Sequence, residues 1–320
     1  MLIFFSNFAA QTVFDMKKFY SLFVAALCSV SIWATEGALC GKFTINALGE
    51  QVIFSQGNLQ YKASTDTWRF AKNQYDTIGS RNANISSAYT GWIDLFGWGT
   101  GNDPVKTNTN ESAYFPFHEW GANPISNGGN VANLWRTLTL SEWAYMLNIR
   151  ANCTNLCGKA TVNNVRGYVL LPDDWTLPSG LSFTPSAADW TTNTYYADEW
   201  QEMEDAGAVM LVANGFRYGA TNVGSFGEMI MYWSANSTSE YTAGCVGFFD
   251  DLIYTDNARS NGEGVRLVQD VANTPTNVSS PANEQTSLSA NKRIVNGQLV
   301  IERDGRIFNT TGVEVSAVNQ

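Results

Sequence analysis

The sequence contains a single histidine and few charged residues. Because His118 is the only imidazole in 320 residues, the chain cannot supply a zinc or iron site that needs several histidines. A Ser-His-Asp triad would also have to use His118, and residues 114–118 carry no nucleophile motif. Charged residues make up 15% of the chain, against 13% aromatic and 44% hydrophobic residues. This composition excludes a disordered or coiled-coil chain and indicates a folded, aromatic-rich protein.

Long apolar segments are also scarce. The clearest one, residues 19–33, is too short to span a bilayer comfortably, and it follows two lysines and precedes the small residue Ala34. This order is typical of a secretory signal, so we expect a signal peptide over residues 1–34. Met16 stands directly before the lysines, which makes residues 1–15 a candidate misassigned start. The mature chain is expected to have no transmembrane span.

Basic residues are outnumbered, which gives a formal net charge of −10. An acidic surface repels phosphate backbones, so we expect no nucleic acid partner. The simplest role of the acidity is solubility. The signal peptide predicts an exported protein, which would be at the cell surface, associated with the outer membrane, or extracellular.

Cysteines are few, and none has the paired CxxC spacing of a zinc site. After removal of the signal peptide four remain, and an even number in an exported chain permits disulfides. Cys153 and Cys157 are close enough in sequence to form a local bridge. A bridge between Cys40 and Cys245 would connect the two ends of the main domain. The sequence decides neither pairing.

Most of the chain is a series of short β-favouring segments separated by Gly, Asn, Ser and Asp, which predicts short strands and turns. The predicted strands are residues 42–45, 51–54, 58–61, 67–71, 159–162, 166–171, 208–213, 229–234, 241–249 and 264–268.

Two helices are predicted. Thr139 and Glu142 form a capping box, and the apolar stripe that follows predicts a helix over residues 140–150. A second helix is predicted over residues 197–206, ended by Gly207.

The C-terminal part changes in composition. Residues 270–291 lose their aromatics and gain Pro, Ser, Thr and Asn, which predicts a linker. Residues 292–320 follow as a small β-rich tail, whose Asn-Gly and Asp-Gly pairs predict two hairpin turns. The tail resembles the sorting and anchoring segments of exported Bacteroidetes proteins.

Several blocks in the main domain carry a family resemblance. They include GKFTIN, VIFSQGNLQY, GWIDLFGWGT, LWRTLTLSEWAYMLNIR, GKATVNNVRGYVLLPDDW, EWQEMEDAGAVMLVANGFRYG, YWSANS and GVRLV. In this order, over about residues 41–268, they resemble the Fibrobacter succinogenes major paralogous domain family of exported Bacteroidetes proteins. The helix start at 139–142 and the closing GVRLV resemble those of formylglycine-generating enzymes, the sulfatase-modifying-factor branch of C-type-lectin-like folds.

The resemblance implies an α+β, C-type-lectin-like domain over residues 35–269, with short twisted sheets, two main helices and long loops. Formylglycine-generating enzymes need two neighbouring cysteines near the end of this domain to bind copper. Here Cys245 stands alone in that region, so we expect a buried structural thiol and no enzyme activity. A sulfatase-modifying-factor-like oxidase is the least favoured alternative.

In lectin-like folds the variable surface comes from loops before the last strands, here residues 234–263. Aromatic side chains beside amides and carboxylates suit sugar stacking or a protein epitope. The predicted ligand-binding residues are Trp233, Asn236, Tyr241, Phe249, Asp250, Asp251, Tyr254, Asn257 and Arg259. For Trp233 the competing interpretation, a role in the core, is favoured.

No cofactor is expected. Asp94, Asn102 and Asp103 offer oxygen ligands in irregular loops, which calcium prefers, but they match no defined calcium loop. Asx turns are therefore the favoured interpretation, with a structural calcium ion as the alternative.

These observations predict a non-enzymatic, secreted or cell-surface binding module for a glycan or protein ligand. Two alternatives stay open: an architectural surface protein without a ligand, and a variable display protein of the kind encoded by diversity-generating retroelements. A pocket bordered by exposed aromatics would favour binding over architecture.

Overall fold

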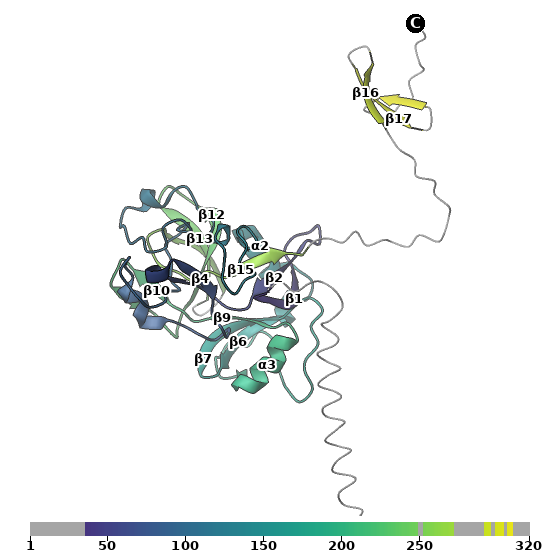
Figure 1. Ribbon diagram of the computed structural model, residues 1–320. Coiled ribbons are helices and arrows are strands. Elements are labelled where there is room, and N and C mark those ends of the chain that lie inside the picture. Colours follow the sequence, from purple (N-terminus) through teal and green to yellow (C-terminus); the bar gives the residue numbers. More distant parts are fainter. Residues whose placement is uncertain (1–35, 249–251, 272–290, 296–297, 304–305, 310–320) are drawn as a thin grey trace, which may run out of the picture. The chain divides into compact units, whose positions relative to one another are not determined.

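The structure is a computed structural model, and the chain divides into two compact units, Met1–Ala272 and Asn273–Gln320. The described residues are 36–248, 252–271, 291–295, 298–303 and 306–309 (Figure 1). The predicted signal peptide lies outside these residues, as does most of the predicted linker.

One sheet of the larger unit pairs its opening strands with its closing strand. In the order β1-β2-β15-β5 it contains Ala38–Thr44, Gln51–Ser55, Leu267–Asp270 and Arg136–Thr137. All of its pairings are antiparallel. Phe43, Val52 and Phe54 are fully buried because alternate residues of a strand face the same side. Val271 N donates to Gln51 O at 2.9 Å, so the sheet continues past the predicted start of the linker.

A second sheet carries a helix. In the order β8-β6-β7-β9 it contains Thr194–Tyr195, Cys157–Val162, Val165–Leu170 and Val209–Val212. Asn163 and Asn164 join β6 to β7 with positive φ angles of 46° and 66°, the conformation that a two-residue hairpin turn requires. Helix α3 (Ala197–Asp205) packs Trp200 and Met203 into a buried cluster with these strands.

The third sheet corrects the expectation of long display loops over residues 234–263. Strands β12 (Ile230–Ser237), β13 (Thr242–Phe248) and β14 (Leu252–Ala258) form an antiparallel sheet in that order. Most of the predicted loop region is therefore regular sheet. Asn257 and Arg259 are held by hydrogen bonds at the end of β14.

The remaining elements are short. Strands β3 (Leu59–Lys62) and β4 (Thr67–Phe70) form one hairpin, and β10 (Phe216–Tyr218) and β11 (Asn222–Gly224) form another. The 3-10 helices η1 to η5 are Ala63–Thr65, Gly79–Asn84, Glu111–Tyr114, Trp120–Ala122 and Cys153–Asn155. The hairpin β10–β11 has no counterpart among the predicted strands.

Both predicted helices are confirmed. Helix α2 (Leu140–Asn148) begins with the predicted capping box: Glu142 N donates to Thr139 Oγ1, and Thr139 N donates to the Glu142 carboxylate. These bonds satisfy amides that the first helical turn leaves without partners. Asn236 Oδ1 accepts from Leu140 N at 2.7 Å, which connects the helix start to β12.

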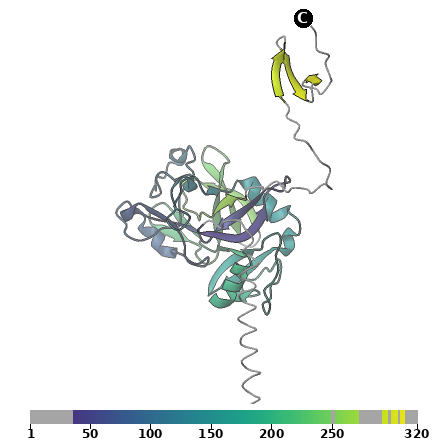
Figure 2. The ribbon, with the colours of Figure 1, turned by 45° about the vertical axis from the view of Figure 1, so that its right-hand side comes forward.

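The larger unit is arranged around three buried hydrophobic clusters. The first cluster lies between β1, β2 and α2 and residues of β6, β7, β9, β12, β13 and β15. The second lies under α3. The third is rich in tryptophan and lies beneath β3, β4 and the loops around residues 93–135. Figures 1 and 2 show α3 and the β6–β9 sheet at one end of this unit and β12–β13 toward the other. The tryptophan-rich cluster supports the loops that carry the candidate site.

The smaller unit contains β16 (Asn291–Val295), β17 (Gln298–Arg303) and β18 (Arg306–Asn309). These strands form a three-stranded antiparallel sheet. The Asn-Gly and Asp-Gly pairs fall between the strands, so the predicted strand positions are confirmed.

The protein is mixed α and β, built mostly of sheets with few helices, which confirms the α+β class. Among the described residues, no helix is both long and apolar enough to cross a membrane.

Candidate ligand-binding site

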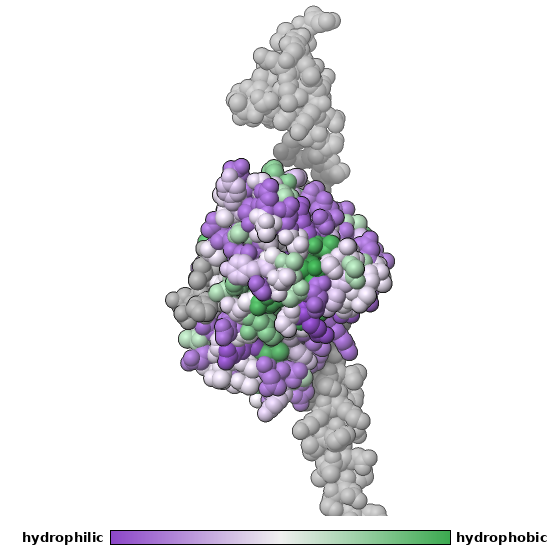
Figure 3. Space-filling model, turned by 90° about the vertical axis from the view of Figure 1, so that its left-hand side faces the viewer, coloured by the Kyte–Doolittle hydropathy of each residue, from purple (hydrophilic) through white to green (hydrophobic). Residues whose placement is uncertain are grey.

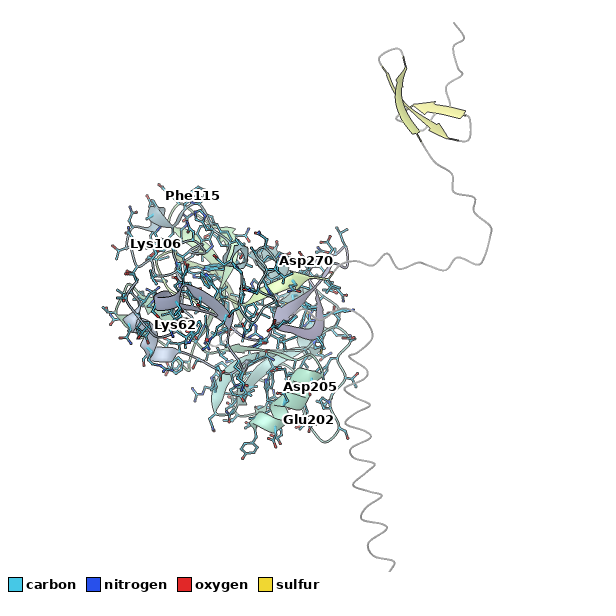
Figure 4. The ribbon with its side chains drawn as sticks, in the orientation of Figure 1. Lys62, Lys106, Phe115, Glu202, Asp205 and Asp270 are labelled. Carbon is cyan, nitrogen blue, oxygen red and sulfur yellow. The ribbon has the colours of Figure 1, made fainter. Side chains whose placement is uncertain are left out.

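A small cavity of about 110 Å³ opens between two loops of the larger unit. Its lining residues are Gly99, Thr100, Asn102, Asp103, Lys106, Ala113, Tyr114, Phe115, Pro116 and His118. Figure 4 shows Phe115 and Lys106 at one end of this unit and the α3 residues Glu202 and Asp205 at the opposite end. The cavity therefore lies far from α3.

Backbone hydrogen bonds join the two loops directly. His118 N donates to Gly99 O, and Gly101 N donates to His118 O, both at 3.1 Å. Gly99 has φ +63°, and a Cβ there would lie 2.9 Å from Phe117 Cα. A Cβ at Gly101 would collide with the carbonyl of Glu119. Only glycines permit this approach of the two backbones, so the back of the cavity is fixed by main chain.

Tyr114 and Lys106 form one wall. Tyr114 is buried, its hydroxyl donates to Asn108 O at 2.9 Å, and burial raises its pKa to about 12. Lys106 Nζ donates to Ala113 O at 2.6 Å and lies 5.1 Å from the centroid of the Tyr114 ring. One of the three donors of the ammonium is thus used by the protein, and the group keeps its positive charge at the cavity wall.

Asp103, Asn102 and His118 are the polar groups available to a ligand. All three are exposed at the cavity. Their side chains make no hydrogen bond to another described residue. Together they offer a carboxylate acceptor, an amide that donates and accepts, and an imidazole that can do both.

Phe115 forms the apolar border of the cavity and is 63% exposed. The guanidinium carbon of Arg259 lies 5.5 Å from its ring centroid and 4.9 Å from that of Trp98. Arg259 is itself only 2% exposed. A large apolar side chain is thus held at the surface by a buried cation and an aromatic layer beneath it.

Hydrogen bonds hold Arg259 in this position. Its Nη2 donates to Ser237 Oγ and to Ser239 O, both at 2.5 Å, and its Nε donates to Thr242 O at 3.3 Å. The guanidinium therefore binds the turn between β12 and β13 while its face supports Phe115. The pKa of Arg259 is lowered by burial, which the nearby carboxylates of Glu111 and Glu240 oppose.

Two further contacts stiffen the surroundings. Glu111 accepts from Ser260 N and Ser260 Oγ, both at 2.6 Å, so η3 is attached to the end of β14. Under the cavity, the rings of Trp98 and Phe117 are 5.1 Å apart, and those of Phe117 and Trp120 are 5.4 Å apart. The loops rest on a continuous aromatic layer.

Tyr241 is a predicted ligand-binding residue that is exposed and whose main chain contacts Arg259. It is 54% exposed, and Arg259 N donates to its carbonyl at 3.2 Å. Tyr241 and Phe115 are therefore both attached to Arg259. Figure 3 shows that the face of the unit on the left of Figure 1 is mainly hydrophilic, with hydrophobic residues in a broken band.

The other predicted site residues have structural contacts or lie outside the described residues. Trp233 is buried, and its Nε1 donates to Phe96 O at 2.7 Å. Asn236 binds the start of α2, and Asn257 Nδ2 donates to Glu263 Oε1 at 2.7 Å. Phe249, Asp250 and Asp251 lie outside the described residues, as does the side chain of Tyr254.

The sequence patterns indicated neither Phe115 nor Lys106 as site residues, and they gave His118 no part in a triad or a metal site. The signal for this site was weak: a glycine-rich segment, residues 97–101, and an aromatic, proline-containing segment, residues 114–118. Neither has a periodic pattern that would show which side chains reach solvent.

Asp94, considered as a calcium ligand, is used differently. It is buried, and its carboxylate accepts from Asn82 Nδ2 at 2.7 Å and from Ile78 N at 3.0 Å. Burial raises its pKa to about 6 against the opposing effect of these bonds. Asn102 and Asp103 instead line the cavity. Within the described ranges there is no cluster of three or more His, Cys, Asp or Glu side chains suited to a metal.

The described residues contain no disulfide bond. Cys40 Sγ donates to Asp205 O, and Cys157 Sγ donates to Cys153 O, each at 3.3 Å. The thiol of Cys245 is buried and hydrogen-bonded to the Glu263 carboxyl, and burial together with this carboxyl raises the pKa of the thiol well above its usual range. Burial also raises the pKa of Glu263, to about 8.

Comparisons with known proteins give no match: no family model fits the chain, and no curated protein or solved structure is significantly similar to it. The candidate site has a geometry suited to recognition of a ligand. It combines an exposed aromatic ring, a small polar cavity and a rigid support, which together can hold a ligand group in a defined orientation.

Proposed function

We propose that the protein is an exported, non-enzymatic binding module that holds a glycan or protein ligand at the cell surface. In this proposal the larger unit is a C-type-lectin-like domain. The pairing of its opening and closing strands, its two helices and its long loops support that assignment, together with the family resemblance of the sequence blocks.

One observation carries the proposal: Phe115 is exposed beside a polar cavity and lies against the buried guanidinium of Arg259. Burying the Arg259 guanidinium costs free energy unless its donors are satisfied. Here it is bound by the turn at residues 237–242 and lies against Trp98 and Phe115.

The absence of catalysis is supported by the chemistry of Cys245. A nucleophilic or metal-binding cysteine acts as the thiolate. Burial and the adjacent Glu263 carboxyl favour the protonated thiol, which is a poor nucleophile and a poor ligand.

The test is a binding screen of the purified chain on arrays of glycans and of peptides, with Phe115→Ala compared to wild type. Tyr196→Ala is the matched control, because Tyr196 is 73% exposed and precedes α3, far from the cavity. The proposal predicts a ligand whose binding is lost in Phe115→Ala and kept in Tyr196→Ala. Binding to neither array, or equal binding by both variants, would support the architectural alternative.

A further inference from the structure

We infer that the cavity recognises one ring of a neutral saccharide, stacked on Phe115 and hydrogen-bonded through its hydroxyls to Asp103, Asn102 and His118. This inference rests on the proposed function, because it names the ligand class of the same site.

The size of the cavity is the first reason. Cavities that enclose a drug-sized ligand usually measure about 300 to 1,000 Å³, well above the 110 Å³ here. The site can therefore take only part of a larger ligand. A chain of sugar rings presents many similar small polar groups, and one ring at a time can enter such a cavity.

The second reason is the pattern of donors and acceptors. A sugar hydroxyl donates one hydrogen bond and accepts others, so it pairs best with a mixed set of groups. Asp103 accepts, whereas Asn102 and His118 can each donate and accept. These side chains make no hydrogen bond to another described residue, so a ligand can bind them without breaking protein contacts.

The charges of the site disfavour ionic ligands. For an anion, the attraction of the Lys106 ammonium, which lines the cavity, is offset by the Asp103 carboxylate, and Arg259 is buried under its own turn. For a cation, the attraction of the Asp103 carboxylate is offset in the same way by Lys106. A single exposed carboxylate beside an ammonium gives little net attraction for either sign.

The aromatic border supplies the apolar contact. One face of a pyranose carries C–H groups with slight positive charge, and the face of an aromatic ring is slightly negative. Phe115 is exposed enough to take such a ring, and Arg259 fixes its orientation. Because Phe115 is already in contact with Arg259 before the ligand arrives, its side chain loses little conformational freedom on binding.

The experiment measures binding of the purified chain to neutral oligosaccharides of glucose, galactose and mannose, by saturation-transfer NMR and titration calorimetry. The same backbones carrying uronic acid or sulfate groups, and an acidic peptide, are the comparison ligands. We expect at least one neutral oligosaccharide to bind, with its ring C–H protons saturated. Binding should fall about tenfold or more in Phe115→Ala and in Asp103→Ala, and stay unchanged in Tyr196→Ala.

The outcomes separate the two proposals. If the acidic peptide or a charged saccharide binds through Phe115 and no neutral saccharide does, the binding function stands and the saccharide inference is wrong. If no ligand binds at millimolar concentration, both are wrong. Neutral binding that Phe115→Ala and Asp103→Ala leave intact places the saccharide elsewhere and also overturns the inference. Circular dichroism of each variant distinguishes lost binding from lost folding.

Discussion

In the loops around the cavity, main-chain hydrogen bonds and glycines hold the structure, and the side chains of Asp103 and Phe115 face solvent. In the β12–β14 sheet and the residues just after it, polar and aromatic side chains of the same kinds are turned inward: Trp233 binds Phe96 O, and Arg259 binds the 237–242 turn. We expect the exposed side chains of the first region, such as Phe115, to be replaceable without loss of the fold, whereas the buried side chains of the second are needed for it. Residue type alone does not separate a recognition surface from its support.

The largest expected effect is a loss of stability on replacing a buried residue of the β12–β14 sheet. Trp233→Ala removes a fully buried indole and its hydrogen bond to Phe96 O, so it should destabilise the protein by about 4 kcal/mol. Phe115→Ala, at an exposed ring, should stay within about 0.5 kcal/mol of wild type. Urea denaturation followed by tryptophan fluorescence measures both. Similar losses for the two variants would remove the distinction.

The next effect concerns the backbone contact between the loops. Gly101→Ala forces a Cβ against the carbonyl of Glu119 and should cost about 3 kcal/mol, with reduced ligand binding. Gly224→Ala is the control, because a Cβ there would have only ordinary contacts, the nearest at 3.5 Å. The measurement is the urea midpoint of each variant. A stable Gly101→Ala would show that the loops adapt easily.

Arg259 joins the two regions, so its replacement sharpens the comparison. Arg259→Met keeps the length of the side chain but removes its hydrogen bonds to the 237–242 turn, and should destabilise the protein by about 2 kcal/mol. It should also weaken ligand binding, because Phe115 loses its support. Denaturation and calorimetry on the same sample test both effects; unchanged ligand affinity would contradict the supporting role.

The smallest expected effect is a pH dependence of the folding stability, which comes from Glu263 in the segment after β14. Because the pKa of Glu263 is raised to about 8 in the folded protein, the fold favours its protonated form. The stability that this proton contributes is complete below the unfolded pKa and falls by about 1 kcal/mol per pH unit as pH rises toward 8. Asp94, with a pKa of about 6, acts in the same direction at lower pH.

Glu263→Gln should flatten the decline in stability between pH 6 and pH 8, a window above the pKa of Asp94. Glu202→Gln, at an exposed position on α3, should leave the decline unchanged. Thermal unfolding at several pH values provides the measurement. A decline that persists in Glu263→Gln would mean that another group is responsible.

Local patterns predicted much of the fold. The capping box at Thr139 and Glu142 located α2, and the Asn-Gly and Asp-Gly pairs located the turns of the smaller unit. These signals act between residues near in sequence. The pairing of β15 with β2, by contrast, joins residues over 200 positions apart, and no local pattern encodes it.

Of the predicted ligand-binding residues, Tyr241 is exposed and Arg259 lies buried against Phe115, while Asn102 and Asp103, which were considered as calcium ligands, line the cavity. A buried arginine is satisfied by distant partners such as Ser237 and Trp98, so its sequence neighbours make it resemble a surface residue. Phe115 shows the reverse. It is an apolar residue that is 63% exposed, and nothing near it in the sequence indicates that its ring would face solvent.

The position of β15 also has a mechanical consequence. This strand is bonded to β2 on one side and β5 on the other, and the chain leaves the larger unit directly after it. Tension applied to the chain beyond Val271 therefore pulls on a strand that is hydrogen-bonded on both edges. Such a strand resists extraction better than an edge strand, whose hydrogen bonds can break one at a time.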